Sequence, residues 1–436
     1  MQVDYAKRTL TNGLDVIVHE HHAVPLVAVS VWYHVGSKNE RPDRTGLAHL
    51  FEHLMFEGSA HQPRGYFAPL QEAGAALNGS TSTDRTNYWE VVPKNAIRLA
   101  LWMESDRMGW LLPALSAERF ETQRAVVLNE RRQNYENRPY GLASFAIHEA
   151  VFPASHPYHW PTIGHPADLA AATIDDVRAF FTRYYHPGNA SLAIAGDIDP
   201  EEAFALAEEY FGGIPAGEPV RPVVAPVPRP RAGRLVIEDR VELPRLYLAW
   251  PSPALFAPGD AELDLAADIL GNGPTSRLYK RLVHDTRIAA ELAAAQTSRE
   301  LAGTFQIIAT AAPGRTMAEL ETAIFDELAR FSASGPDEAE LARGRAQSGA
   351  AFVYRLQTLG GFGGKADQLN AYNVYKRDPG YFAADLQRYL HATARDLQTS
   401  VGRWLDPRLA VALSVVPQGR RDLAPDAAGA AIEVGS

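Results

Sequence analysis

The chain has 436 residues, enough for two or three domains of ordinary size. With 46% hydrophobic and 22% charged residues, its composition is that of a globular protein and excludes a collagen-like, coiled-coil or disordered chain. The formal net charge of -10, without any Lys/Arg-rich run, argues against a nucleic-acid binder. The absence of cysteine excludes disulfides and thiolate ligands, so any metal must be held by His, Asp or Glu.

No stretch is apolar for long enough to span a bilayer, and the first 20 residues lack the basic and then apolar pattern of a signal peptide. We therefore expect no membrane association and a cytoplasmic location. A periplasmic location remains open if a signal peptide has been removed from the chain.

The pattern along the chain mixes strands and helices without strict alternation. Alternating β-branched residues predict strands at Leu14–Glu20 and Pro25–Val35. Amphipathic periodicity predicts helices at Leu47–Met55, Ala96–Leu112, Ala117–Tyr135 and Pro200–Gly213. This order is typical of an α+β protein in which a mostly antiparallel sheet is layered with helices.

The two halves of the chain resemble each other. Thr173–Gly196 and Thr393–Val416 follow the same plan of helix, proline turn and strand at an offset of 220. Between them, residues 215–234 carry six prolines and are typical of a semi-rigid linker. We predict two homologous duplicated domains, residues 1–214 and 235–436.

The helix predicted at Leu47–Met55 carries two histidines and a glutamate on one face. At about 100° per residue, His49, Glu52 and His53 lie opposite the apolar stripe, and the i, i+4 spacing places the two imidazoles one above the other. A catalytic zinc needs three protein ligands and an open position for water, so a further oxygen ligand is required. Glu130 is a candidate. The alternative is that the histidines and Glu130 are ordinary surface residues.

The inverted motif His49-x-x-Glu52-His53, followed by Glu130 after 76 intervening residues, resembles the pitrilysin/insulinase family of metallopeptidases, the inverzincins. The duplication and the linker resemble the small two-domain members and the processing peptidases of that family. The resemblance implies that His49, His53 and Glu130 bind one Zn²⁺ per chain and that Glu52 is the general base. It implies an endopeptidase that acts on peptides or unfolded chains bound in extended form.

The segment Leu77–Pro93 resembles the family's "N-A-x-T" strand, a sheet edge that pairs with the backbone of a peptide substrate. Asn78 and Gly79 match that position, and the resemblance makes them substrate-binding residues. From the segment alone, an ordinary strand is an equal alternative.

Two positions depart from the family pattern. Seven residues before Glu130, where the family usually has a glutamate, stands Gln123, which can still hydrogen-bond to a metal ligand but adds no charge. The second departure concerns the arginine and tyrosine with which members that act alone reach the active site. The corresponding positions here are Val283 and Ala290.

Without that pair, the zinc site lacks a donor for the developing oxyanion. We therefore predict the metal-bearing subunit of a heterodimer whose homologous partner supplies the Arg/Tyr pair. The second half carries Asp268, Gly271 and Asn272 at the positions offset by 219 from His49, Glu52 and His53, and so is predicted to lack a metal site. A non-catalytic structural or peptide-binding subunit is the alternative function.

Overall fold

In the computed structural model, residues 3–425 and 430–431 are described, and they divide into two compact units that are discontinuous in sequence. Unit 1 comprises residues 1–130, 160–223 and 351–385. Unit 2 comprises residues 131–159, 224–350 and 386–436. Each unit therefore combines segments from both halves of the chain. The predicted boundaries, 1–214 and 235–436, divide the chain by sequence repeat, which is a different division.

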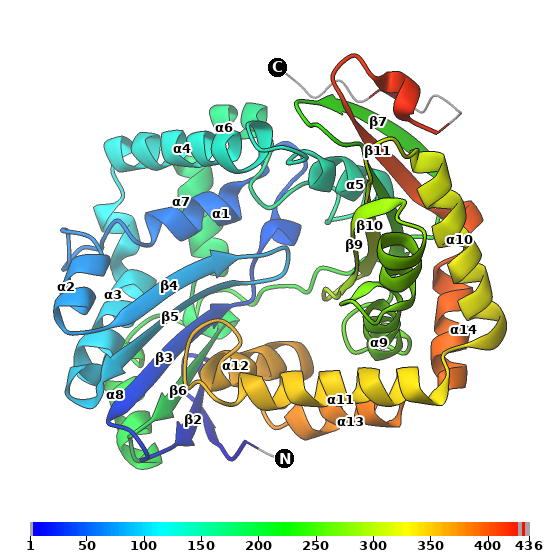
Figure 1. Ribbon diagram of the computed structural model, residues 1–436. Helices are drawn as coiled ribbons and strands as arrows, with labels where there is room; N and C mark the ends of the chain where they lie inside the picture. Colours follow the sequence, from blue (N-terminus) through cyan, green and yellow to red (C-terminus); the bar gives the residue numbers. More distant parts are fainter. Residues whose placement is uncertain (1–2, 426–429, 432–436) are drawn as a thin grey trace. The chain divides into compact units, whose positions relative to one another are not determined.

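Each unit contains a six-stranded sheet (Figure 1). In unit 1 the strand order is β1 (Ala6–Thr9), β2 (Asp15–Glu20), β6 (Ala190–Gly196), β3 (Leu26–Tyr33), β5 (Thr86–Pro93) and β4 (Ala76–Thr81). In unit 2 it is β12 (Ala430–Ala431), β7 (Gly233–Asp239), β11 (Val411–Pro417), β8 (Arg245–Ser252), β10 (Gly303–Ala311) and β9 (Ala289–Thr297).

The two sheets share the topology of five strands and differ at one edge, where β1 pairs antiparallel with β2 but β12 pairs parallel with β7. The β2–β6 pair and its counterpart β7–β11 are parallel, whereas the three strands that follow in each sheet pair antiparallel. This confirms the predicted α+β fold with two homologous domains, each built on a mostly antiparallel sheet.

Helix caps repeat between the units as well. Thr173 caps α7 (Ile174–Tyr184) by accepting from the backbone N–H of Asp176, and Thr393 caps α14 (Ala394–Trp404) by accepting from that of Asp396. In both cases the aspartate bonds back to the backbone N–H of the threonine, which satisfies two otherwise unpaired donors. The match at an offset of 220 therefore reflects equivalent structure.

The remaining helices of unit 1 are α1 (Leu47–Leu54), α2 (Phe67–Glu72), α3 (Ile97–Ala114), α4 (Ala117–Arg131), α6 (Pro166–Ala171), α8 (Pro200–Phe211) and α12 (Lys365–Lys376). Those of unit 2 are α5 (Ala143–Val151), α9 (Asp260–Gly271) and α10 (Met317–Ser334), whereas α11 (Glu338–Arg355) and α13 (Phe382–His391) run from one unit into the other. Short 3₁₀ or π turns are η1 (Ser37–Asn39), η2 (Lys94–Ala96), η3 (Arg132–Glu136), η4 (Pro187–Asn189), η5 (Tyr279–Asp285), η6 (Pro407–Leu409) and η7 (Arg421–Leu423).

Each sheet is covered on one face by a helix from the other half of the chain. In unit 1, α3 and α8 cover one face, and α12, from the second half, packs against β6 and β3 on the other (Figure 1). In unit 2, α9, α10 and α14 build one core, and α5, from the first half, packs against β11 and β8. Both faces of the central strands β3, β6, β8 and β11 are thereby buried, which explains why these strands are apolar on both sides.

The segment Leu77–Pro93, considered above as a single edge strand, is a hairpin. Its first part forms β4 and its second part forms β5, joined by a turn at residues 82–85. Of these two strands, β4 lies at an edge of the sheet and β5 lies between β4 and β3. The polar run Ser82–Arg85 supplies the turn, because the hydroxyl of Ser82 accepts from the backbone N–H groups of Asp84 and Arg85.

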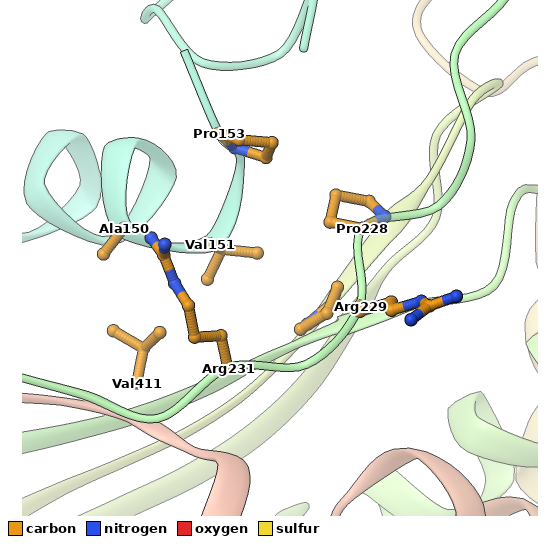
Figure 2. A pocket seen from close by; sticks show the side chains of 8 residues that line it. Ala150, Val151, Pro153, Pro228, Arg229, Arg231 and Val411 are labelled. Atoms are coloured by element: carbon orange, nitrogen blue, oxygen red, sulfur yellow. The ribbon is translucent and has the colours of Figure 1, made fainter. Parts of the chain in front are cut away.

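Within the described ranges, none of the helices combines the length and the hydropathy that crossing a bilayer would require. A pocket of unit 2 lies between the end of α5, the proline-rich segment and strands β8 and β11 (Figure 2). Its lining is Ala150, Val151, Pro153, Pro228, Arg229, Arg231, Pro251 and Val411. It therefore contains neither a nucleophile nor a metal ligand.

Candidate metal centre

Helix α1 presents His49 and His53 on its polar face. Leu50, Phe51 and Leu54 on the opposite face are fully or almost fully buried and anchor the helix in unit 1. The two imidazole rings lie 4.9 Å apart between centroids at an interplanar angle of 80°. The i, i+4 spacing thus produces a pair of rings that can face one ion.

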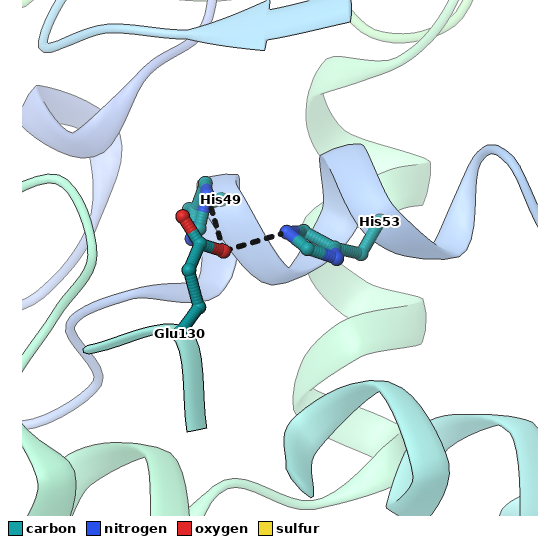
Figure 3. A group of neighbouring side chains, drawn as sticks. All are labelled: His49, His53 and Glu130. Atoms are coloured by element: carbon teal, nitrogen blue, oxygen red, sulfur yellow. Dashed lines mark ion pairs between the residues drawn. The ribbon is translucent and has the colours of Figure 1, made fainter. Parts of the chain in front are cut away.

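Glu130, at the end of α4, points its carboxylate at both rings (Figure 3). Its Oε2 atom lies 3.3 Å from Nε2 of His53 and 3.7 Å from Nε2 of His49. All three ligand atoms lie within 4.8 Å of one another, and in the described part of the chain this is the one group of three or more such side chains with that property. The structure therefore brings together the three residues that the sequence motif singled out.

The geometry of this group fits zinc. A tetrahedral zinc with bonds of about 2.0–2.1 Å holds neighbouring ligand atoms roughly 3.3 Å apart, close to the two separations found here. Two imidazoles and one carboxylate are also a donor set that zinc accepts. The side chains of His49, His53 and Glu130 are 14%, 23% and 32% exposed, which leaves the site reachable by solvent.

The two histidines titrate differently. Burial, together with the charge of His53, lowers the pKa of His49 to about 4. Burial also acts to lower the pKa of His53, but the hydrogen bond and the charge of Glu130 outweigh it and hold that pKa above its usual value. Since a ligand imidazole must be neutral, protons would compete with a metal at this site mainly at His53.

Glu52 lies on the same helix, beside the histidines. Its Oε2 atom accepts a hydrogen bond of 2.7 Å from the hydroxyl of Thr81 on β4. Burial raises the pKa of Glu52, whereas the Thr81 hydrogen bond and the charge of Arg85 act to lower it. The carboxylate is therefore fixed through one oxygen, and its basicity is increased by partial burial.

Gln123 lies next to His53. Its hydrogen bond with the His53 side chain acts to raise the pKa of that histidine, and its Nε2 atom donates to Oε1 of Glu57 at 2.8 Å. Metal-bound histidines usually have such a second hydrogen-bond partner. In contrast, Nδ1 of His49 is buried and has no hydrogen-bond partner among the described residues.

Asn78 and Gly79 lie on β4, the edge strand that continues to Thr81. The side chain of Asn78 is exposed and its Oδ1 accepts from the backbone N–H of Gly79 at 2.8 Å. A Cβ atom at Gly79 would lie 2.9 Å from the rings of Phe56 and Tyr88, so a side chain there would push the strand away from them. Glycine lets β4 pack closely against the segment that follows α1.

Two residues that position the site were not predicted from the sequence. One is Thr81, which holds Glu52. The other is Glu40, whose buried carboxylate accepts from the backbone N–H groups of Gly46 and Ala48 at 2.9 and 2.8 Å and so caps α1. Burial raises the pKa of Glu40 to about 8. Glu40 lies outside the His49–His53 motif, so no pattern pointed to it. Thr81 occupies the last position of the "N-A-x-T" pattern and could have been predicted from it.

Val283 and Ala290, the positions at which the resemblance leads us to expect the Arg/Tyr pair, belong to unit 2. Val283 lies in η5, partly buried against the core of that unit, and Ala290 is exposed on β9. The nearby Arg277 forms a two-pronged ion pair with Glu340, and Arg281 bonds to Asp326. Neither Val283 nor Ala290 offers a hydrogen-bond donor from its side chain.

Comparison with known proteins places the chain in a family. A family model described as insulinase (peptidase family M16) matches residues 15–157, and another described as the peptidase M16 inactive domain matches residues 171–348. The chain is 29% identical over 356 residues to a protein of Helicobacter pylori named zinc protease PqqE, with 80% of each chain covered. It is 28% identical over 353 residues to a protein of Mycobacterium leprae named an uncharacterized zinc protease, with 79% of this chain and 77% of that protein covered.

Solved structures agree with this assignment. A protease from Helicobacter pylori matches with a TM-score of 0.87 and 26% identity, covering 96% of this chain and all of that one. A structure from Pseudomonas fluorescens titled peptidase M16 inactive domain matches with a TM-score of 0.85, covering 95% of this chain and 98% of that one, and at 20% identity it shows a shared fold alone. The chain belongs to the insulinase family, peptidase family M16.

Proposed function

We propose that this chain is a zinc-dependent endopeptidase that hydrolyses peptides or unfolded chains bound in extended form. The observation that carries the proposal is the approach of Glu130 to Nε2 of His49 and of His53, at 3.7 and 3.3 Å. The similar proteins named zinc proteases support the same chemistry. A structural subunit would have no chemical need for this trio with Glu52 beside it.

His49, His53 and Glu130 would hold the metal, with Gln123 orienting the ring of His53. A zinc ion bound there would supply Lewis acidity and would lower the pKa of water to around 7. Glu52 would take the proton from the attacking water. Because Oε2 of Glu52 is engaged by Thr81, Oε1 is the oxygen free to accept it. The resulting carboxylic acid then donates the proton to the nitrogen of the leaving amine.

Strand β4 would bind the substrate. An edge strand presents unpaired backbone N–H and C=O groups, to which an extended peptide can add as a further strand. Asn78 and Gly79 lie on this strand, and Thr81, which holds Glu52, is its last residue. The same strand would thus position both the peptide backbone and the general base.

We further propose that a homologous partner subunit supplies the Arg/Tyr pair, since Val283 and Ala290 cannot stabilise an oxyanion. A missing oxyanion donor costs on the order of 100- to 1000-fold in kcat. The isolated chain should therefore be slow, and a homologous protein that co-purifies with it should restore the rate. Full activity of the isolated chain would contradict this part of the proposal. Location in the cytoplasm remains a prediction.

The function is tested with Glu52→Gln in a peptidase assay, with zinc measured in the same samples. We expect peptide cleavage to fall roughly 100- to 10,000-fold while zinc content is unchanged, because the substitution removes the base and retains the shape. Chelation should abolish cleavage and added zinc should restore it. Equal cleavage by the Glu52→Gln and wild-type proteins would refute the proposal in favour of a non-catalytic subunit.

A further inference from the structure

The loop between α11 and α12 packs on the face of the unit 1 sheet opposite to α1. Gly360 lies so close to the sheet that a Cβ atom there would be 2.6 Å from Val91 on β5 and 2.7 Å from Ala28 on β3. Two further glycines, Gly361 and Gly363, adopt left-handed backbone angles with φ of +84° and +77°. Between them, Phe362 projects with half of its surface exposed.

Three part-buried hydrogen bonds to one aspartate hold the loop. Asp367, in the first turn of α12, accepts hydrogen bonds from Nε1 of Trp32 at 2.7 Å and from Nδ2 of Asn87 at 2.9 Å. Its other oxygen accepts from the backbone N–H of Gly363 at 2.7 Å. The aspartate thus ties the loop to β3 and β5 and holds Phe362 in place.

Phe362 forms an edge-to-face pair with Trp89 of β5, with ring centroids 5.6 Å apart at 86°. Trp89 is the direct cross-strand neighbour of Asn78 on the edge strand β4. The two side chains of such a pair lie on the same face of the sheet. Phe362 therefore continues a row that begins at the proposed substrate-binding residue Asn78.

On this face β4 carries only small side chains. Ala76, Asn78 and Ser80 alternate with residues directed toward α1, and all three side chains are smaller than those of Trp89 and Phe362. Small side chains at the edge of the sheet are therefore followed by two aromatic rings, Trp89 and Phe362. We call the surface formed by Ala76, Asn78 and Ser80, with these two rings beside it, the ledge. An added strand would place every second side chain on this ledge and the intervening side chains on the face of α1.

We infer that Phe362 and Trp89 form a subsite for a bulky apolar side chain of the substrate, on the face opposite to the zinc ligands. This inference rests on the proposed function for its use in catalysis. The chemical class of ligand is an extended peptide with a large aliphatic or aromatic residue on the ledge face. Phe362 is a specificity-determining residue, and the reacting bond lies on the other face.

The test first uses a peptide library to find the substrate position at which the wild-type protein prefers a bulky apolar residue. The wild type and Phe362→Ala are then compared on two peptides that differ only in Phe or Ala at that position. Tyr354→Ala is the control, because Tyr354 is an aromatic residue of α11 with 65% exposure and takes no part in the ledge. We expect Phe362→Ala to reduce the Phe/Ala ratio of kcat/KM about tenfold, the effect of losing one aromatic contact. Phe362→Leu should retain most of the ratio, and Tyr354→Ala all of it.

Binding of the same peptides to the zinc-loaded Glu52→Gln protein, by fluorescence anisotropy, separates this inference from the proposed function. If the wild-type protein never cleaves, but Phe362→Ala changes the ratio of the affinities for the Phe and Ala peptides, the proposed function is refuted and the subsite is supported. A wild-type protein that cleaves, with a ratio unchanged within twofold by Phe362→Ala, would overturn the subsite alone. Absence of any peptide binding would overturn both.

Discussion

The hydroxyl of Thr81 donates a 2.7 Å hydrogen bond to Oε2 of Glu52, and so joins the edge strand of the unit 1 sheet to the helix that carries both histidines. The proposed peptide-binding strand and the proposed general base are therefore positioned by one contact. The bond also acts to lower the pKa of Glu52 against the effect of its burial.

Replacing Thr81 with valine should remove this bond while preserving the shape of the side chain. The pKa of Glu52 should rise, which moves the acid limb of the kcat/KM profile to higher pH, and the maximal rate should fall about tenfold because the base loses its orientation. Zinc content should not change. Thr81→Ser keeps the hydroxyl and should behave like wild type, and an unshifted pH profile for Thr81→Val would count against this role.

Gln123→Ala should weaken zinc binding about 10- to 100-fold, since the ring of His53 loses the group that orients it. Competition with a fluorescent zinc chelator measures the affinity. Glu118→Ala, an exposed change at the start of the same helix, is the matched control and should have no effect. The role assigned to Gln123 fails if both variants bind zinc like wild type.

Glu40→Ala leaves the backbone N–H groups of Gly46 and Ala48 without their buried acceptor. We expect a loss of roughly 2–3 kcal/mol in the free energy of unfolding and a weaker zinc site, because these groups begin the helix that carries His49. Glu40→Gln keeps one acceptor oxygen for these two N–H groups, because its NH2 group cannot accept a hydrogen bond. Its loss in urea unfolding should therefore be smaller than that of Glu40→Ala, but should not vanish. Equal losses for the two variants would contradict this account.

Asp264 on α9 provides a pH-dependent test of stability in unit 2. Burial, with Asp260 and Asp268 nearby, raises its pKa to about 7, while its Oδ2 accepts from the hydroxyl of Tyr389. A raised carboxyl pKa means that the contribution to stability is complete below the unfolded pKa near 4 and is lost as the pH rises through 7.

Asp264→Asn, which cannot ionise but keeps the acceptor for Tyr389, should therefore be more stable than wild type at pH 8.5, on the order of 1–3 kcal/mol. The advantage should shrink at pH 5.5. Thermal unfolding at both values measures it, with the exposed Asp285→Asn as control. A gain of equal size at both pH values would show that the charge of Asp264 is not the cause.

Local patterns predicted the features that arise from neighbouring residues. The apolar stripe of α1, the i, i+4 pair His49 and His53, and the repeat of helix, proline turn and strand that begins at Thr173 and Thr393 are all properties of short segments, so the sequence contains them directly. Glu130 was only one possible third ligand on this basis, and the family resemblance singled it out, because its spacing from His53 carries no geometric signal of its own.

Long-range packing could not be predicted in this way. Helix α5, from the first half of the chain, packs on the sheet of unit 2, and α12, from the second half, packs on the sheet of unit 1. The periodicity of a helix shows which of its faces is apolar, but not which sheet that face will cover. Glu40 was not predicted either, because a side-chain cap is expected directly before its helix and Glu40 lies seven residues before α1 begins. The turn at residues 82–85 was missed because it contains neither Gly nor Pro, and its hydrogen bonds come from the hydroxyl of Ser82.

The central claim is that His49, His53 and Glu130 bind one zinc ion per chain, and metal analysis tests it most directly. The wild-type protein, equilibrated with zinc and then dialysed, should retain one zinc per chain, whereas Glu130→Ala should retain about a tenth of that or less. Retention of no zinc by the wild type, or of as much zinc by Glu130→Ala as by the wild type, would contradict the account.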